Sequence, residues 1–204
     1  MPISVCKYAN VAFDSTLNSQ FNIILGSQSP RRKELLAGLD IPFTTKVIPG
    51  LEETYPASLQ GEAIPVYLAE QKADAYTLED NELLITADTI VWLDGKVYGK
   101  PADEAEAHQM LRALSGKTHD VITGVCVRTN QKNVSFASTT KVRFAHLTDD
   151  EIAHYINKYR PMDKAGSYGV QEWIGYIGVE HIEGSYFNVM GLPIQKLYTV
   201  LKEF

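Results

Sequence analysis

The sequence predicts a mixed α/β fold in which helices alternate with strands and several strands pair in antiparallel ribbons. Helical stripes of apolar residues alternate along the chain with β-type apolar runs, which indicates that both kinds of element share a core. Residues 119–128 and 134–145 form a long antiparallel pair in this interpretation, and residues 83–93 return through Asp94-Gly95, a two-residue hairpin turn, into 96–98. This order differs from the strict βαβ alternation of a doubly wound fold.

Capping signals mark where the helices begin. Ser29 is an N-cap candidate with Pro30 at the first helical position, while Asp103 with Glu106 and Thr148 with Glu151 have the spacing of capping boxes. The first expected elements are a strand at 22–25, a helix at 31–39 ended by Gly38 and Pro42, and a strand at 43–47. A helix at 61–76 with the stripe Leu68, Ala69, Ala73 and Tyr76 comes next, followed by the hairpin at 83–98 and a helix from Asp103 to near Gly116. After the antiparallel pair we expect a helix that follows Thr148 and bears Ile152, Tyr155, Ile156 and Tyr159, and a final helix that carries Leu197, Val200 and Leu201.

Composition sets the class of protein. The 204 residues are 45% hydrophobic, enough for one large α/β domain, which we place at residues 22–204 after an N-terminal extension at 1–21. The extension lacks the basic and apolar regions of a signal peptide, and Cys6 and Cys126 lie too far apart for a CxxC metal site. These features predict a cytoplasmic protein.

Two classes of partner are disfavoured. The net charge of −6 argues against a broad nucleic-acid-binding face. No apolar run approaches the roughly 18 residues that span a bilayer, so we expect no membrane partner. An acidic protein of this kind that binds a polyphosphate needs a local basic pocket and a divalent cation.

Such a basic pocket is indicated at residues 27–36. Arg31, Arg32 and Lys33 fall in the first turn of the expected helix, where the helix dipole is already positive and backbone N–H groups are free. An anion bound there would compensate these cations, because a helix start with guanidinium groups is a phosphate site in outline. A solvated basic turn explains the charges equally well.

Other charged residues occur where structure alone would not require them. Asp88 lies inside an apolar strand, and a buried carboxylate needs a cation or donors, although a solvated edge strand would also accommodate it. Lys72 falls within an apolar helical stripe, where a lysine ordinarily extends past the core to solvent. Hairpin register places Lys100 opposite Thr89. Glu53 is a candidate second carboxylate, or a residue of an acidic surface turn.

Taken in order, these segments resemble the Maf family of nucleoside triphosphate pyrophosphatases. The resemblance covers the chain from about Asn22 to its C-terminus. It rests on Ser27-x-Ser29-Pro30-Arg31-Arg32-x-Glu34-Leu35-Leu36, the acidic pair Glu52-Glu53 after Pro49-Gly50, Ala87-Asp88-Thr89, Gly99-Lys100-Pro101, and residues 115–119, 163–166 and 184–193.

The resemblance implies a fold similar to the inosine triphosphate pyrophosphatases, with an elongated mixed sheet, two lobes and a central cleft. It also implies hydrolysis between the α and β phosphates, which yields a nucleoside monophosphate and pyrophosphate. Asp88 is then the catalytic carboxylate and a metal ligand, Glu53 its metal-binding partner, and Lys72 and Lys100 phosphate ligands. Ser27, Arg31 and Arg32 belong to the signature loop. Mg²⁺ or Mn²⁺ suits such an all-oxygen site.

Substrate choice follows from the same resemblance. Arg32, Thr89 and Gln171 match the branch of the family that acts on thymidine and uridine triphosphates. A glutamine amide can both donate to and accept from a pyrimidine edge. Residues 163–171 and 184–186 also match this branch more closely than the related 7-methyl-GTP branch.

Alternatives remain open from the sequence. A non-catalytic nucleotide-binding regulator of septum formation would keep the phosphate-binding cations but could lose Glu53 or Asp88, and both are present. A general phosphatase would release orthophosphate. An aromatic-rich C-terminal third could line the pocket, form a homodimer interface or pack in the ordinary way; it contains Tyr168, Trp173, Tyr176 and Tyr186.

Overall fold

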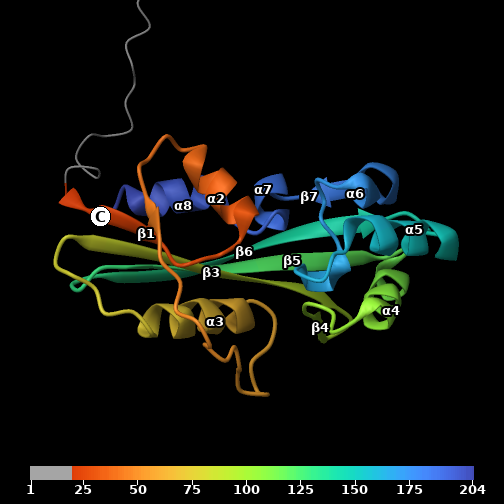
Figure 1. The fold of residues 1–204 in the computed structure, drawn as a ribbon, viewed down its shortest axis with the longest axis horizontal. Coiled ribbons are helices and arrows are strands. Elements are labelled where there is room, and N and C mark those ends of the chain that lie inside the picture. Colours follow the sequence, from red (N-terminus) through yellow and green to blue (C-terminus); the bar gives the residue numbers. More distant parts are fainter. Residues whose placement is uncertain (1–19) are drawn as a thin grey trace, which may run out of the picture.

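The computed structural model describes residues 20–204, and a twisted seven-stranded mixed sheet runs through its whole length (Figure 1). The extension expected at 1–21 therefore lies almost wholly outside the described residues. Strand order is β2-β1-β3-β5-β6-β7, with β4 paired to β3. The strands are β1 (Asn22–Leu25), β2 (Thr44–Thr45), β3 (Glu82–Leu93), β4 (Lys96–Tyr98), β5 (Thr118–Arg128), β6 (Asn133–Phe144) and β7 (Val179–Glu183).

Helices cover both faces of this sheet. In Figure 1, α3 lies below it, while α2, α7 and α8 lie above it. None of the helices in residues 20–204 is long and apolar enough to cross a membrane. The helices are α2 (Pro30–Ala37), α3 (Ala63–Asp74), α4 (Glu104–Leu114), α5 (Asp149–Tyr159), the 3₁₀ turn η1 (Ala165–Ser167), α6 (Trp173–Gly178), α7 (Tyr186–Val189) and α8 (Ile194–Leu201).

Strand β3 supplies alternate side chains to two cores. Leu83, Ile85 and Ala87 pack toward α2 and α8 with Leu36 and Leu197. Successive residues of a strand point to opposite faces, so the even-numbered side chains face α3. They form smaller clusters in which Leu84 meets Ala69 and Ala73, and Ile90 meets Ile64 and Leu68.

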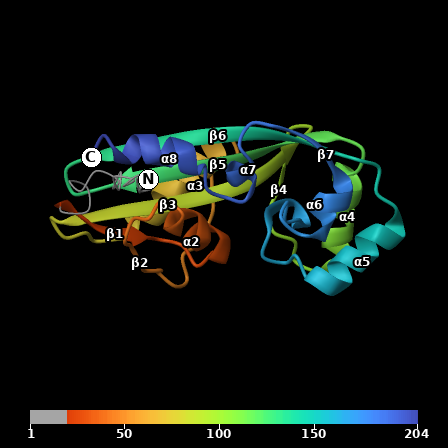
Figure 2. The same cartoon turned by 90° about the horizontal axis from the view of Figure 1, so that it is seen from above.

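The far ends of β3, β5 and β6 carry a separate core. It packs α4, α5 and α6 around buried residues that include Leu111, Phe144, Ile152 and Tyr155. Viewed from above, these helices form one lobe, and α2 with β1 and β2 belongs to the other (Figure 2). The expected mixed α/β class with an elongated, two-lobed sheet is confirmed.

One edge of β3 is open between the lobes. Parallel strand β1 pairs with β3 only as far as Ile85, and antiparallel β4 begins to pair at Val91. Strand β5 occupies the opposite edge along the whole interval. Residues 86–90 of β3 therefore have no neighbouring strand on the β1 side, and this interval contains Asp88 and Thr89.

Gly124 brings α3 close to this part of the sheet. It lies on β5 directly opposite Asp88, and a Cβ atom there would come within 2.2 Å of the Pro65 carbonyl carbon of α3. We expect Gly124→Ala to lower the free energy of unfolding by about 3 kcal/mol, since helix backbone has to move away. Urea unfolding measures this change. Gly99→Ala is the matched control, because no atom beyond its chain neighbours lies within 4 Å of a Cβ at Gly99. An equal loss of unfolding free energy in both variants would contradict the packing argument.

His119 is a buried polar group of the second lobe. Its ring packs edge-to-face on Phe144 and Tyr168, and Nε2 lies 2.8 Å from the Tyr168 hydroxyl. Burial lowers the pKa of His119 to about 4, against an ordinary value of 6.5. The unfolded chain therefore binds an extra proton between these pH values, and stability falls as the pH is lowered from 6.5 to 4.

This pH dependence is a testable property of His119. From the two pKa values we expect a loss of about 3 kcal/mol in the free energy of unfolding across that interval, attributable to this one residue. Comparing the wild type with His119→Gln at both pH values isolates the contribution, because other titrating groups cancel. Equal pH dependence of the two proteins would show that His119 is not buried in its neutral form.

Most expected elements are present, with shifted boundaries. The hairpin through Asp94-Gly95, the β5–β6 pair and the Thr148–Glu151 capping box are confirmed. The helix expected at 31–39 ends at Ala37, and the strand expected at 43–47 shrinks to Thr44–Thr45. The sequence interpretation missed η1, α6, β7 and α7, since these elements have only three to six residues and show no apolar periodicity.

Candidate active site

A cleft of about 510 Å³ lies between the lobes at the open edge of β3. Its walls come from the β1–α2 loop, residues 47–53, α3, β3, the segment after β4, residues 163–171 and residues 189–191. The residues that the sequence assigned to catalysis, substrate binding and metal binding all line this cleft: Ser27, Arg31, Arg32, Glu53, Lys72, Asp88, Thr89, Lys100 and Gln171.

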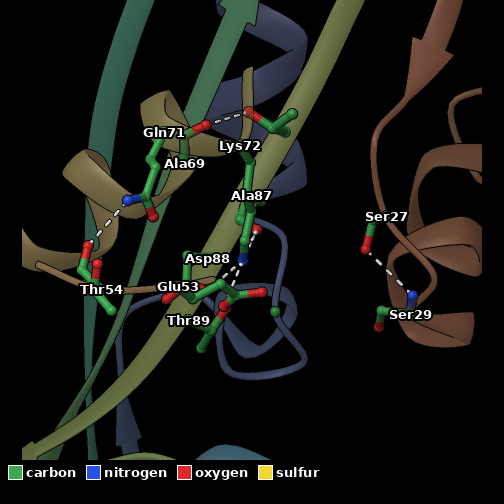
Figure 3. Close-up of polar contacts among 12 residues, drawn as sticks. Ser27, Ser29, Glu53, Thr54, Ala69, Gln71, Lys72, Ala87, Asp88 and Thr89 are labelled. Atoms are coloured by element: carbon green, nitrogen blue, oxygen red, sulfur yellow. Dashed lines mark hydrogen bonds and ion pairs between the residues drawn. The ribbon is translucent and has the colours of Figure 1, made fainter. Parts of the chain in front are cut away.

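A lysine shared by two carboxylates lies at the centre of the cleft. Lys72 Nζ is 2.6 Å from Asp88 Oδ1 and 3.0 Å from Glu53 Oε2, and the three side chains point toward one another (Figure 3). Asp88 is 8% exposed, and its buried charge is compensated by this ammonium. Lys72 does not extend past the core to solvent, because its side chain points from α3 toward Asp88 on β3.

A second cation, Lys100 after β4, acts on Glu53. Burial raises the pKa of the Glu53 carboxyl, but the ammonium groups of Lys72 and Lys100 outweigh burial and hold that pKa below its usual range. Lys100 is exposed at the cleft. The expected register is observed as far as Val91 opposite Tyr98, but the β3–β4 ladder ends there, so Lys100 does not pair with Thr89, although both residues line the cleft. The segment after Gly99 leaves the sheet instead.

The start of α2 forms another wall. Ser29 caps this helix by accepting a hydrogen bond from Arg32 N–H, with Pro30 in the first turn, as its sequence predicts. Arg31 reaches across the cleft to the other lobe, where its Nη1 lies 3.1 Å from Asp163 Oδ2. Ser27 is buried, and its Oγ accepts a hydrogen bond from Ser29 N–H at 3.2 Å.

The guanidinium of Arg32 is bound by the protein itself. Its Nε donates to the Gly191 carbonyl at 2.8 Å, and its Nη1 donates to the Ala87 carbonyl at 2.9 Å. Its Nη2 donates to Thr89 Oγ1 at 3.0 Å. Three of its nitrogens are thus engaged with protein acceptors, and two of these acceptors, on Ala87 and Thr89, flank Asp88 in sequence. This arrangement fixes the open edge of β3 against the turn at Gly191.

Sequence reasoning missed a charged group in the second lobe. Lys164 is 7% exposed and lies 2.7 Å from Asp163 Oδ1 and 3.2 Å from Glu172 Oε1. Burial raises the pKa of Asp163, but Lys164 and Arg31 outweigh burial and lower it. A chain of charges therefore crosses the cleft from Glu172 to Arg31. The segment 163–166, which contains Asp163 and Lys164, could have indicated these charges, but the sequence analysis used it only for the resemblance to the Maf family.

The aromatic residues of the C-terminal third divide between two environments. Tyr168 is buried and lines the cleft, and Trp173 packs partly buried against the second core. Tyr176 and Tyr186 are exposed on the surface at 84% and 41%. Of these four residues, only Tyr168 forms part of the site.

Glu53 and Asp88 fit a magnesium or manganese ion. Both carboxylates converge on one ammonium, so their oxygens face a common point. No group of three or more His, Cys, Asp or Glu side chains in residues 20–204 could hold a metal ion alone. Two carboxylates suffice for Mg²⁺ when water and substrate phosphates supply the other ligands.

Comparison with known proteins decides the family. A model of Maf-like proteins matches residues 22–204. The chain belongs to the Maf-like family. A protein of Phocaeicola vulgatus named dTTP/UTP pyrophosphatase is 62% identical over 90% of this chain and 96% of its own length. A protein of the same name from Porphyromonas gingivalis is 56% identical over 91% of this chain and 95% of its own length.

Among solved structures, a HAM1 protein from Coxiella burnetii is similar to this Maf-like chain with a TM-score of 0.48. The two are 18% identical, and the match covers 90% of this chain and 100% of that one. The segments that suggested a Maf-like protein from the sequence all fall within the matched range that begins at residue 22.

Proposed function

We propose that this Maf-like protein hydrolyses nucleoside triphosphates between the α and β phosphates and releases a nucleoside monophosphate and pyrophosphate. The observation that carries the proposal is the group Glu53, Lys72 and Asp88, which combines two converging carboxylates with a cation in a cleft edged by further cations. This combination suits the attack of water on a polyphosphate, because catalysis there consists mainly of positioning and charge neutralisation.

Cations on three sides of the cleft would bind the triphosphate. Arg31 at the first turn of α2, Lys72 on α3 and Lys100 after β4 surround the carboxylates. Bound phosphate would compete with Asp163 for Arg31, whose ion pair with Asp163 spans the cleft. Backbone N–H groups at the start of α2 favour the same anion.

Asp88 would accept the proton of the attacking water. A carboxylate 8% exposed and held at 2.6 Å by Lys72 has a fixed orientation, which a general base needs. Glu53 and Asp88 would also hold a divalent cation, which when bound neutralises phosphate charge and lowers the pKa of a coordinated water. Lys72 would turn from the carboxylates toward phosphate oxygens as the substrate enters.

We propose dTTP and UTP as the substrates, and the cytoplasm as the compartment. The named activity of the relatives from Phocaeicola vulgatus and Porphyromonas gingivalis supports the substrates. Gln171 and Thr89 line the cleft and would contact the nucleoside, and Arg32 would act by holding Thr89. The single buried thiol of the described chain, Cys126, is free, in keeping with a reducing compartment.

Initial rates with a panel of nucleoside triphosphates test this proposal. We expect pyrophosphate release with Mg²⁺ or Mn²⁺, fastest for dTTP and UTP and slower by at least roughly tenfold for ATP, GTP and CTP. A preference for purines would contradict the substrate assignment but not the reaction. A non-catalytic regulator would bind nucleotides without turnover, and a general phosphatase would release orthophosphate, so product analysis separates these alternatives.

A further inference from the structure

A chain of hydrogen bonds lies beneath Thr89, on the face of β3 opposite to Asp88. Arg32 Nη2 donates to Thr89 Oγ1 at 3.0 Å, and Thr89 Oγ1 lies 2.9 Å from Thr123 Oγ1 on β5. Thr123 Oγ1 in turn donates to the backbone carbonyl of Asn188 at 3.3 Å. The chain thus runs from the start of α2 through two paired strands to α7.

Its ends determine the direction of its protons. A guanidinium only donates and a carbonyl only accepts, while each threonine hydroxyl has a single proton. If Thr123 gives its proton to Asn188, then the 2.9 Å contact requires Thr89 to give its own proton to Thr123. If Thr123 instead gives its proton to Thr89, then the Thr89 proton has no acceptor among residues 20–204. The direction from Thr89 through Thr123 to Asn188 therefore makes one more hydrogen bond within the protein than the reverse direction.

Thr89 is then left with one lone pair that takes no hydrogen bond from residues 20–204, on a side chain that lines the cleft. Thr89 is partly exposed and lines the cleft, whereas Thr123 is fully buried. Gly191 lies beside this hydroxyl, since a Cβ atom there would be 3.6 Å from Thr89 Oγ1, and it adds no side chain next to it. The Thr89 hydroxyl can therefore accept a hydrogen bond from a ligand but has no proton to donate.

We propose that Thr123 is a positioning residue that makes Thr89 an obligate acceptor, so that the substrate group bound at Thr89 is a hydrogen-bond donor. This inference rests on the proposed function. Two donors are common to dTTP and UTP, the 3′-hydroxyl of the sugar and the N3–H of the base. The 2′-hydroxyl is absent from dTTP, and the phosphates carry only acceptors. Cytosine has an acceptor at N3, so contact with N3 would also disfavour CTP.

Substrate analogues combined with a variant of Thr123 test this inference. In the wild type, either 3′-deoxy-UTP or N3-methyl-UTP loses roughly tenfold in kcat/KM relative to UTP, since the Thr89 lone pair is left unpaired. The analogue that shows the loss identifies the donor. In Thr123→Val the Thr89 proton is freed and the hydroxyl can donate. An analogue with an acceptor in place of the identified donor (3′-deoxy-3′-fluoro-UTP for the 3′-hydroxyl, CTP for N3–H) is therefore expected to lose roughly tenfold relative to UTP in the wild type but at most about threefold in this variant. We expect this difference between the wild type and Thr123→Val to appear in KM.

Two controls separate this role from general packing. Thr123→Ser retains the hydroxyl and should restore the wild-type discrimination. Thr86→Val also removes a fully buried hydroxyl, but on β3, where Thr86 Oγ1 donates to the Ala69 carbonyl of α3 at 2.6 Å. This variant should leave discrimination unchanged. Thermal unfolding verifies that each variant is folded.

Two outcomes would overturn the inference. Equal discrimination by the wild type and Thr123→Val would show that Thr123 does not set the direction of the Thr89 proton, and neither analogue losing activity in the wild type would show that Thr89 accepts no substrate proton. Failure of the proposed function is distinguishable, because the wild type would then release no pyrophosphate from UTP itself.

Discussion

Replacing Asp88 by Asn is expected to lower kcat for UTP by roughly a thousandfold while the protein remains folded. The amide has nearly the same shape as the carboxylate, but it cannot accept the proton of the attacking water and is a poorer ligand for a divalent cation. Lys72 keeps its second ion pair, with Glu53 at 3.0 Å, so its charge is not left without a partner. Pyrophosphate release at saturating UTP measures the effect.

Asp94→Asn is the matched control for this variant. Asp94 is in the hairpin turn that follows the same strand, and its exposed carboxylate pairs with Lys117, at 3.2 Å. Its loss should leave kcat within about twofold of the wild type, because exposed ion pairs contribute little. Turnover by Asp88→Asn close to that of Asp94→Asn would contradict the role assigned to Asp88.

Lys72→Met is expected to lower kcat/KM by roughly a hundredfold and to make stability depend on magnesium. Removal of the ammonium leaves the carboxylates of Glu53 and Asp88 facing a common point with no shared cation. Their repulsion favours any divalent ion that binds between them. We therefore expect saturating Mg²⁺ to raise the Tm of this variant by about 3 °C more than that of the wild type.

Lys117→Met tests whether this magnesium effect is local. Lys117 is another lysine in an ion pair, but it faces the single carboxylate of Asp94 at the surface. Mg²⁺ should raise its Tm no more than that of the wild type. If Lys72→Met and Lys117→Met respond equally to Mg²⁺, then Glu53 and Asp88 do not form a cation site.

The elements of regular length could be predicted because their patterns are local. The apolar run before Asp94-Gly95 predicts a strand and its return, and Thr148 with Glu151 predicts where a helix begins, since each signal lies within a few residues. The short elements between Ala165 and Val189 could not be predicted in this way. They are held by contacts with distant segments, as when Gly166 N–H donates to the Gly99 carbonyl at 3.0 Å.

The site was predictable as a set of residues but not as an arrangement. The out-of-place charge of Asp88 identified that residue directly, because a buried carboxylate requires a partner, whereas Lys72, Glu53 and Gln171 were assigned through the resemblance to the Maf family. Their geometry depends on tertiary structure: the sequence gives no sign that Lys72 bridges two carboxylates or that Arg32 binds the Ala87 and Gly191 carbonyls. For the same reason, register counting gave the correct β3–β4 pairs up to Tyr98 and the neighbourhood of Lys100, but not its strand pairing, since β4 ends before it.

The most direct test of the catalytic role of this cleft is a ³¹P NMR time course of UTP with the wild-type protein and Mg²⁺. Hydrolysis between the α and β phosphates predicts that resonances of UMP and pyrophosphate rise together in equal amounts, and that Asp88→Asn produces neither. Accumulation of UDP with orthophosphate would contradict the account, because water would then attack the terminal phosphate.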